Sequence, residues 1–566
     1  MNFKLIISAT LLAGALTASA QDLTKDITIE RSLNPTLRAA TRLSTSPRLF
    51  QPEIKFQPLT FNENAIQIPL SASIDTLPAA NPQALIEPSY YRGYAQAGYF
   101  PGYNLMVSAG YNIINRSATT LGIWAQFDGD KYNATTPLTA DDYTMHLGRN
   151  AASAGIDLAA IIARAGRLDI NADFTWARQH TANPLAIPEP EFNSVTEFNA
   201  TANWSARLPQ MAYYAKVDFS NFSRHIDKSE APTQNIFSIN GGTAYFFDEH
   251  SQLAGSIGAK FQATSDYIVP LENRTCFAHV ASRTIGIIDF KPAYRYVNSV
   301  FKLNIGINLQ FTSHINKSIN LAPDIHLYYT PVSAFTAYVK LTGGKRLNPI
   351  SELYDYCPYF NPQLAFNGSN VPLEAKFGFA VGPFSGFDFS IEGAYAKANQ
   401  WLMPCNVMRE VGTTDYYYLD AVDLSGFQVT LKAGYELNRY LKAELAYSRA
   451  GNGEKSAYYL NRDRAANILG ASVSSNPIDP LTVDLSFTLR SGRSQFDYVL
   501  TPDNQLAAAQ IKMKSASSLN IGANYRITHA FSVFARVENL LNCRADQVLY
   551  LPMQGVHGAI GASVKF

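Results

Sequence analysis

Four cysteines and nine histidines are the side chains of this sequence best suited to covalent, metal-binding or acid–base chemistry. No two cysteines are spaced as Cys-x-x-Cys, and the histidines are scattered without a close pair, so a zinc site is not indicated. The sequence also has no nucleophile elbow, phosphate-binding loop or His-Glu-x-x-His motif. We therefore expect a protein that is not an enzyme and that needs no cofactor or metal.

The cysteines have a second use if the chain is exported. An oxidising compartment permits disulfides, and four cysteines allow three pairings. Unpaired, half-buried thiols are an equal alternative. All four fall in connections that the strand assignment below places outside the cell, which favours loop disulfides among Cys276, Cys357, Cys405 and Cys543.

The elements that must position these residues are β-strands. In residues 301–311 every odd position is apolar and every even one is polar or Gly, and 481–490 alternates in the same way. Such runs reach ten residues or more, the length of a tilted strand that crosses a bilayer, whereas strands of soluble sandwiches average about five or six. The pattern predicts an all-β fold, a transmembrane antiparallel β-barrel.

In such a barrel the apolar face meets lipid and the polar face lines the lumen. The charges of the polar face are mixed in sign, so no strong ion selectivity follows. They either serve a solute path or pair across neighbouring strands and stiffen the wall. The charges expected to face the lumen include Lys260, Lys302, Lys432, Lys442, Asp484, Arg490, Arg536 and Glu538.

Short turns and long connections alternate along the chain, as periplasmic turns and extracellular loops do in outer-membrane barrels. Long connections are expected near 348–372, 399–423, 451–464, 499–516 and 543–556. The tally is about 22 strands, an even number. The short turns are expected near 115–118, 163–166, 208–210, 248–250, 298–300, 331–333, 382–386, 438–439, 476–480 and 528–530.

The N-terminal part differs in composition. Residues 1–20 combine a lysine, an apolar run of about a dozen residues and Ala18-Ser19-Ala20, the pattern of a cleaved signal peptide. Residues 21–92 are rich in proline and lack sustained alternation, which indicates an extended periplasmic or lumenal leader. The barrel is expected to occupy residues 93–566.

The last strand of the sequence alternates cleanly and stops on an aromatic residue. Ile560, Ala562, Val564 and Phe566 form its apolar face. This arrangement resembles the signal by which the barrel-assembly machinery recognises its clients, so we expect that machinery to be a partner during biogenesis.

A family resemblance rests on the same end of the chain. The run Phe531-Ser-Val-Phe-Ala-Arg-Val-Glu-Asn-Leu-Leu-Asn542, a loop with Tyr550 and Pro552, and then residues 558–566 resemble the end of TonB-dependent receptor barrels. That resemblance implies 22 strands, in agreement with the tally. Those receptors carry a plug of well over a hundred residues, and the leader is too short for one. The barrel resembles plugless relatives of the Bacteroidetes type.

Two functions follow as expectations. One is a channel or receptor for transport across the bacterial outer membrane, and the alternative is a scaffold subunit of an outer-membrane assembly or export complex. Outer-membrane lipid and lipopolysaccharide are the expected surroundings, and outer-membrane or periplasmic proteins are candidate partners. A net charge of +1 provides no basic stripe, so nucleic acid is not an expected partner.

Overall fold

The computed structural model describes most of the chain from residue 90 onward. Residues 1–89 and several connections lie outside the described residues. The described ranges are 90–136, 143–162, 166–181, 191–226, 233–265, 267–270, 277–280, 283–313, 318–356, 368–407, 418–438, 440–451, 465–500, 506–548 and 551–566.

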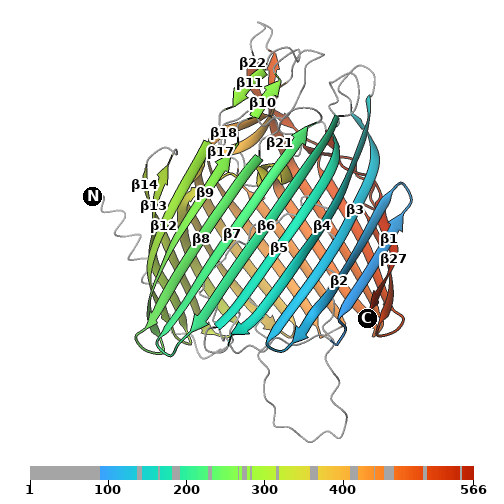
Figure 1. The fold of residues 1–566 in the computed structure, drawn as a ribbon. Coiled ribbons are helices and arrows are strands. Elements are labelled where there is room, and N and C mark those ends of the chain that lie inside the picture. Colours follow the sequence, from blue (N-terminus) through green and yellow to red (C-terminus); the bar gives the residue numbers. More distant parts are fainter. Residues whose placement is uncertain are drawn as a thin grey trace, which may run out of the picture.

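The described chain forms a closed antiparallel β-barrel (Figure 1). Its first half consists of β1 (Gly93–Phe100), β2 (Asn104–Arg116), β3 (Thr119–Thr136), β4 (Tyr143–Ile162), β5 (Gly166–Thr181), β6 (Glu191–Arg207), β7 (Met211–Ile226), β8 (Thr233–Phe246), β9 (Ser251–Thr264), β12 (Arg283–Val297) and β13 (Phe301–Ser313). Its second half consists of β14 (Ile319–Val332), β15 (Phe335–Arg346), β16 (Ser369–Phe384), β17 (Phe387–Val407), β18 (Tyr418–Leu437), β19 (Leu441–Ala450), β20 (Ala465–Ile478), β21 (Leu481–Leu500), β22 (Leu506–Lys512), β23 (Ala516–Arg526), β24 (Phe531–Glu538) and β27 (His557–Lys565).

The barrel closes between its first and last strands. β1 pairs with β27 in antiparallel register, from Tyr94 opposite Lys565 to Tyr99 opposite Ile560. The sheet has 23 segments, but β22 and β23 follow one another and pair with successive parts of β21. Counting β22 and β23 as one strand gives a barrel of 22 strands, which confirms the sequence prediction.

A few smaller elements complete the fold. Two hairpins form separate two-stranded sheets, β10 (Tyr267–Pro270) with β11 (Phe277–Val280) and β25 (Asp546–Val548) with β26 (Leu551–Pro552). One short helix, α2 (Ile350–Tyr356), lies between β15 and β16. Among the described residues no helix is long and apolar enough to cross a membrane.

The two ends of the barrel differ, as the turn pattern predicted. All ten predicted short turns are bracketed by consecutive strands. The eight turns that lie wholly within the described residues are at the end of the barrel where β1 begins and β27 ends (Figure 1). We call this the short-turn end and the opposite rim the long-loop end. Several predicted long connections are shorter than expected, because β17, β18 and β21 continue past the rim as paired backbone that satisfies its own hydrogen bonds.

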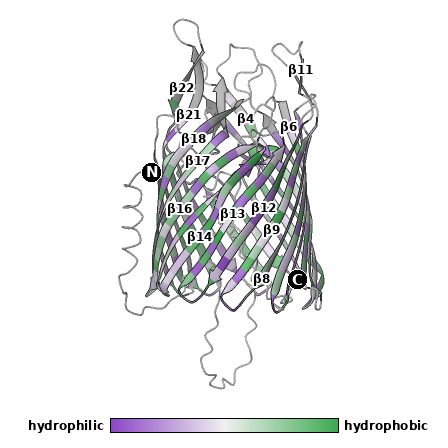
Figure 2. Cartoon of the chain, turned by 90° about the vertical axis from the view of Figure 1, so that its left-hand side faces the viewer, coloured by the Kyte–Doolittle hydropathy of each residue, from purple (hydrophilic) through white to green (hydrophobic). Residues whose placement is uncertain are grey.

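The two faces of each strand differ in the burial of their side chains, as the pleat of a β-strand requires. On β9 the large outward side chains Leu253, Ile257 and Phe261 are exposed, whereas the inward Ala254 and Gln262 are buried. Figure 2 shows hydrophilic and hydrophobic residues alternating along the strands. Because alternate side chains of a strand point to opposite faces, one face of the barrel wall is apolar and the other polar.

Aromatic side chains form pairs on neighbouring strands near the short-turn end. Phe301 lies 4.9 Å from Tyr329 between ring centroids, and Phe387 lies 4.3 Å from Tyr435. Membrane barrels have belts of aromatic side chains where the wall passes from the hydrocarbon of the bilayer to the lipid headgroups. They indicate that lipid ends near this rim.

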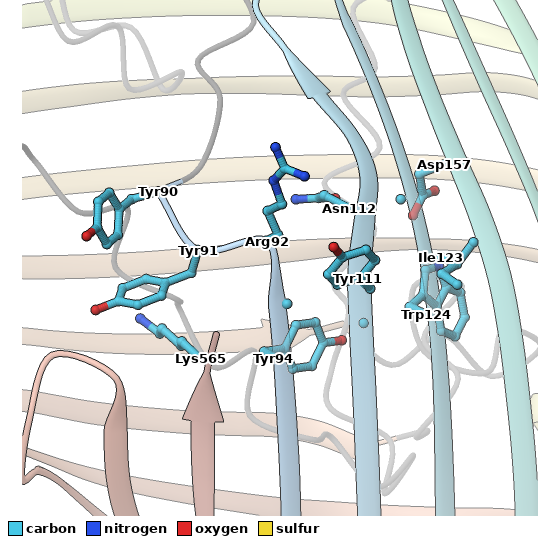
Figure 3. Close-up of a pocket in the computed structure, with 13 residues that line it drawn as sticks. Tyr90, Tyr91, Arg92, Tyr94, Tyr111, Asn112, Ile123, Trp124, Asp157 and Lys565 are labelled. Atoms are coloured by element: carbon cyan, nitrogen blue, oxygen red, sulfur yellow. The ribbon is translucent and has the colours of Figure 1, made fainter.

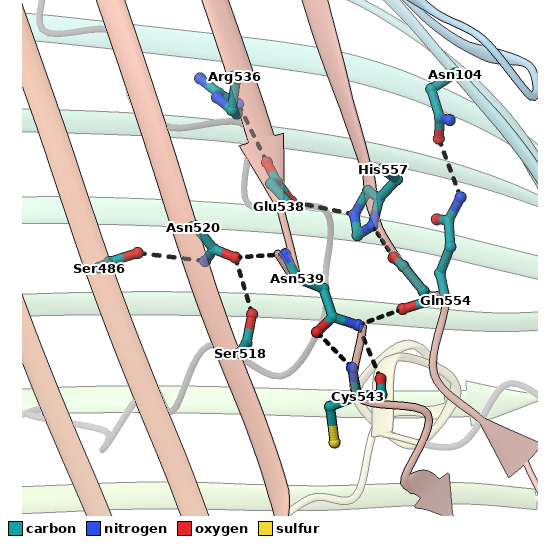
Figure 4. Close-up of polar contacts among 11 residues, drawn as sticks. Asn104, Ser486, Ser518, Asn520, Arg536, Glu538, Asn539, Cys543, Gln554 and His557 are labelled. Carbon is teal, nitrogen blue, oxygen red and sulfur yellow. Dashed lines mark hydrogen bonds and ion pairs between the residues drawn. The ribbon is translucent and has the colours of Figure 1, made fainter. Parts of the chain in front are cut away.

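Residues 531–542, which carry the family resemblance, hold the last hairpin of the barrel in its shape. Asn539 is fully buried at the end of β24, and its Nδ2 donates to the carbonyl oxygens of Cys543 and Gln554 at 2.8 and 2.7 Å (Figure 4). Its Oδ1 accepts from the Cys543 N–H at 3.1 Å, and its own N–H donates to Asn520. Asn539 and Asn542 both have positive φ, which Asn tolerates better than most residues. The two asparagines therefore shape the connection between β24 and β27.

A partly buried ion pair continues this network along the inner wall. Glu538 contacts Arg536 at 3.7 Å and the nearly fully buried His557 at 3.3 Å (Figure 4). Gln554 in turn donates to Asn104 on β2 at 3.2 Å. Side chains from both sides of the barrel seam are thus linked by hydrogen bonds.

Replacing the outward Ile257 with Arg is expected to lower the stability of the barrel in lipid by about 2–4 kcal/mol, because the guanidinium would face hydrocarbon. The matched control is Ser256→Arg, on the inward face of the same strand, which places the same charge in the lumen. Urea unfolding in lipid vesicles measures the difference. Equal losses for both variants would contradict the assigned faces.

Candidate functional site

All eight charges predicted to face the lumen lie on the inward face of their strands. The outward faces are marked by exposed large apolar residues at the positions of opposite parity, such as Leu431 on β18, Leu445 on β19 and Leu485 on β21. What these charges do for a solute is not settled by their position and stays a prediction. The inward residues are Lys260, Lys302, Lys432, Lys442, Asp484, Arg490, Arg536 and Glu538.

Many inward charges pair with a neighbour on their own strand. The partners lie two residues apart, so they share a face, and each pair stabilises the polar wall locally. The two expected roles were a solute path or pairing across neighbouring strands, and pairing within one strand was not expected. The same-strand pairs are Arg167–Asp169, Lys216–Asp218, Lys376–Glu374, Lys442–Glu444 and Arg536–Glu538.

The connection after β15 does not stay outside the barrel. Residues Leu347–Tyr356, which we call the lumen segment, fold onto the inward face of the wall and include α2. Asn348 exchanges hydrogen bonds with Ser369 at the start of β16, at 3.0 and 3.2 Å. Leu347 then packs against the buried Ile285 and Ile287 of β12.

The helix of the lumen segment is docked by apolar and polar contacts together. Ile350, Leu353 and Tyr354 form a buried cluster with Val195 of β6 and Phe222 of β7. The apolar residues of α2 are spaced i, i+3 and i+4, so they share one face of the helix. That face is turned to the wall, and the helix is held as a fixed part of the lumen.

The polar contacts of α2 are buried or partly buried. The Ile350 N–H donates to Gln234 Oε1 at 2.8 Å, and the Tyr354 hydroxyl donates to Gln179 Oε1 at 3.1 Å. The guanidinium of Arg224, itself fully buried, lies 5.9 Å from the centre of the Tyr354 ring. Burial raises the pKa of Tyr354, with Arg149 and Arg224 opposing the rise, so this hydroxyl stays protonated and keeps its donor role.

The lumen segment takes a short path between distant strands. From β15 to β5 the wall passes eight strand-to-strand steps, at least ~38 Å at about 4.8 Å a step. Three extended residues and a helix of seven residues span only about 20 Å. The segment therefore takes a shorter, inner path along the wall and occupies part of the lumen, which it narrows.

A cavity of about 540 Å³ lies between the lumen segment and the wall, and we call it the segment cavity. Its wall side includes Ser238, Lys260 and Asn308, and its segment side includes Leu347 and Glu352. The volume is within the usual range of small-molecule sites. Of the predicted lumen charges, only Lys260 lines it.

A second cavity, of about 330 Å³, lies at the short-turn end beside the barrel seam (Figure 3). Tyr94 of β1, Trp124 of β3 and Asp157 of β4 surround it, together with Tyr91 before the barrel and Lys565 of β27. Gly110 and Gly155 make room for the large rings, because a Cβ would meet Tyr94 and Trp124 at 2.5 and 2.6 Å. We call this the rim cavity.

The cysteines are only partly covered by the described residues. Cys543 carries a free thiol here and accepts a hydrogen bond from the Ser517 N–H at 3.5 Å. Cys276 and Cys357 lie outside the described residues, so the disulfides stay a prediction. The expectation that all four cysteines lie in connections is wrong for Cys405, whose backbone pairs with Tyr418 inside β17 because this hairpin extends beyond the rim.

The predicted assembly signal forms the outward face of β27. Ile560, Val564 and Phe566 are exposed to the surroundings of the barrel, and Ala562 lies between them. Phe566 stacks on Tyr111 of β2 at 6.3 Å between ring centroids. Recognition of this face by the assembly machinery stays a prediction.

Except for Leu347, the lumen segment lies within residues 348–372, for which the sequence predicted a long external connection, so its position inside the barrel was not predicted. A local signal was present: Asn348-Pro349 is a common start for a helix, and apolar residues follow at 350, 353 and 354. This signal indicates a helix with one apolar face but not the surface that covers it. No group of three or more His, Cys, Asp or Glu side chains in the described ranges is placed to hold a metal ion.

No family model matches the sequence, and no curated protein matches it. The fold does resemble solved structures. The FrpB iron transporter from Neisseria meningitidis matches with a TM-score of 0.62 and 11% identity over 84% of this chain and 81% of that one. Pseudomonas aeruginosa FpvA bound to heterologous pyoverdines matches with a TM-score of 0.62 and 10% identity, over 85% and 72%. The siderophore receptor PirA from Acinetobacter baumannii has a TM-score of 0.58 and 10% identity, over 84% and 80%.

At such low identity these likenesses concern the fold alone. They cover a share of this chain that is close to the extent of the barrel. The chain shares the barrel fold of these solved structures, and a helix is docked inside its lumen.

Proposed function

We propose that this protein is an outer-membrane receptor or channel that passes a solute across the outer membrane through its lumen. The observation that carries the proposal is the polar lumen of a wide, closed barrel, narrowed by a docked segment. A barrel of this strand number encloses more space than its own side chains fill. The similar solved structures are named as an iron transporter and a siderophore receptor, which supports a transport role.

The proposal includes the orientation of the barrel in the membrane and the roles of the N-terminal residues. The long-loop end faces the outside of the cell, and the short-turn end faces the periplasm. Residues 1–20 direct export, and residues 21–92 take the place of a full plug at the periplasmic side. The apolar outer face is in contact with membrane lipid.

The test is solute entry into liposomes that contain the full chain. We expect swelling rates that fall as the size of a neutral sugar increases, because the lumen segment limits the width of the path. Liposomes without protein are the control. The absence of flux for every solute, combined with recovery of a stoichiometric partner protein from native membranes, would instead support a scaffold barrel.

A further inference from the structure

The segment cavity has the features of a binding site, and its charges depart from the pattern of the remaining wall. Lys260 of β9 and Lys291 of β12 both line it. Neither ammonium forms an ion pair or hydrogen bond with any of the described residues, whereas five other inward Lys or Arg side chains pair with a carboxylate on their own strand. Lys291 acts on the Asp324 carboxylate of β14 only through its charge, without a bonded contact. Two ammonium groups that have no bonded partner in one cavity favour an anionic ligand.

The other charges that line the cavity have partners of their own. Asp289 accepts a hydrogen bond from Gln310 at 2.6 Å, and the Lys345 ammonium donates to Thr312 at 2.8 Å. Arg346 pairs with Glu374 at 3.2 Å. These contacts hold the walls of the cavity in place and leave Lys260 and Lys291 to meet a ligand.

A buried amide adds a second, independent observation. Asn308 is 6% exposed, and its Nδ2 donates to the Gly343 carbonyl oxygen at 3.1 Å. Its Oδ1 is buried and has no hydrogen-bond partner among the described residues. A buried acceptor without a hydrogen bond is unfavourable, so a hydrogen-bond donor from a ligand would stabilise this oxygen. A ligand hydroxyl group would supply one.

Gly344 lies against Asn308 and leaves space in this part of the segment cavity. Gly344 has a φ of +142°, and a Cβ there would lie 2.8 Å from Asn308 Nδ2 and 2.9 Å from Gln310 Oε1. Only glycine fits both the backbone conformation and the space. The indole of Trp401 and the side chain of Leu402 also line the cavity and offer an apolar surface for a ring.

We propose that the segment cavity binds an acidic sugar, a small ring compound with one carboxylate and several hydroxyl groups. The carboxylate lies between Lys260 and Lys291, and a hydroxyl group donates to Asn308 Oδ1. This inference rests on the proposed function, because the site would lie on the solute path, and it adds a substrate class to it.

The test is calorimetric titration of the purified full chain in detergent micelles with three matched probes. Glucuronate carries the carboxylate and the hydroxyl groups, glucose lacks the carboxylate, and cyclohexanecarboxylate lacks the hydroxyl groups. We expect glucuronate to bind at least about tenfold more tightly than either of the others, the equivalent of one charge-assisted contact.

Two double variants locate the site. K260Q/K291Q is expected to remove the preference for glucuronate over glucose. K302Q/K432Q removes two inward lysines that do not line the cavity, and it is expected to bind all three probes as the unaltered protein does. A folded K260Q/K291Q variant that keeps the preference would overturn the assignment, as would equal binding of glucuronate and glucose.

The outcome is separable from that of the proposed function. Neutral-sugar flux in liposomes without glucuronate binding would overturn this inference and leave the transport role in place. Glucuronate binding without flux of any solute would support the site and contradict transport.

Discussion

Replacement of the whole connection between Arg346 and Ser369 by an Asn-Gly turn is expected to raise the single-channel conductance several-fold. Arg346 and Ser369 are directly opposite each other in the β15–β16 ladder, so a two-residue turn can join them without disturbing the barrel. The variant lacks the lumen segment and with it the helix that occupies part of the lumen. Conductance rises because the aqueous path widens.

The matched control removes a different connection. Arg283 of β12 lies opposite Thr264 of β9, so the β10–β11 hairpin can be replaced by the same Asn-Gly turn. In Figure 1 this hairpin projects above the long-loop end, away from the barrel wall. We expect this control to conduct as the unaltered protein does. If both deletions leave the conductance unchanged, the lumen segment does not limit the path.

Asn539→Ala is expected to lower the free energy of unfolding by about 3 kcal/mol or more. The substitution leaves a backbone N–H and two carbonyl groups without the side-chain partners that they have now, at about 1–3 kcal/mol for each group left unsatisfied in a buried position. It also places Ala at a positive φ, which adds roughly 1–2 kcal/mol. Urea unfolding in detergent micelles, followed by tryptophan fluorescence, measures the loss.

Asn438→Ala is the control for backbone strain. Asn438 has the same φ of 49° in the turn after β18, but its side chain makes no hydrogen bond with any of the described residues. The free energy of unfolding of the Asn438→Ala variant is expected to fall only by the conformational cost of the positive φ, roughly 1–2 kcal/mol. Comparable losses for the two variants would mean that the Asn539 hydrogen bonds add nothing to the stability of the last hairpin.

The barrel itself could be predicted from the sequence because the period of two is a direct consequence of the strand pleat. Residues 301–311 show it without interruption, and β13 begins at the expected Phe301. Turns such as 298–300 were also predictable, since a tight reversal needs particular residues: Asn298 Oδ1 accepts hydrogen bonds from the N–H groups of Val300 and Phe301. Strand number and closure follow from these local signals.

The lumen segment could not be predicted, because its partners are distant in the sequence. Ile350 is hydrogen-bonded to a residue 116 positions away and Tyr354 to one 175 positions away. Local residue types indicate that α2 has an apolar face but contain no information on which wall covers it. For the same reason the sequence placed Lys260 in the lumen without distinguishing it from Lys302, although only the first lines the segment cavity.

The central claim is that each strand has one face toward lipid and one toward a water-filled lumen open to the outside. Neighbouring residues on β8 test it directly. Ser238 lines the segment cavity, and Ile239 is exposed on the outer face. Each is replaced by Cys in a variant whose four native cysteines are Ser, and whole cells are treated with a membrane-impermeant maleimide.

The account predicts that the cysteine at position 238 is labelled from outside the cell, because water reaches it through the lumen. It predicts that the cysteine at 239 is protected by lipid. Labelling of 239 with protection of 238, or equal labelling of both, would contradict the barrel orientation and the aqueous path on which the proposed function depends.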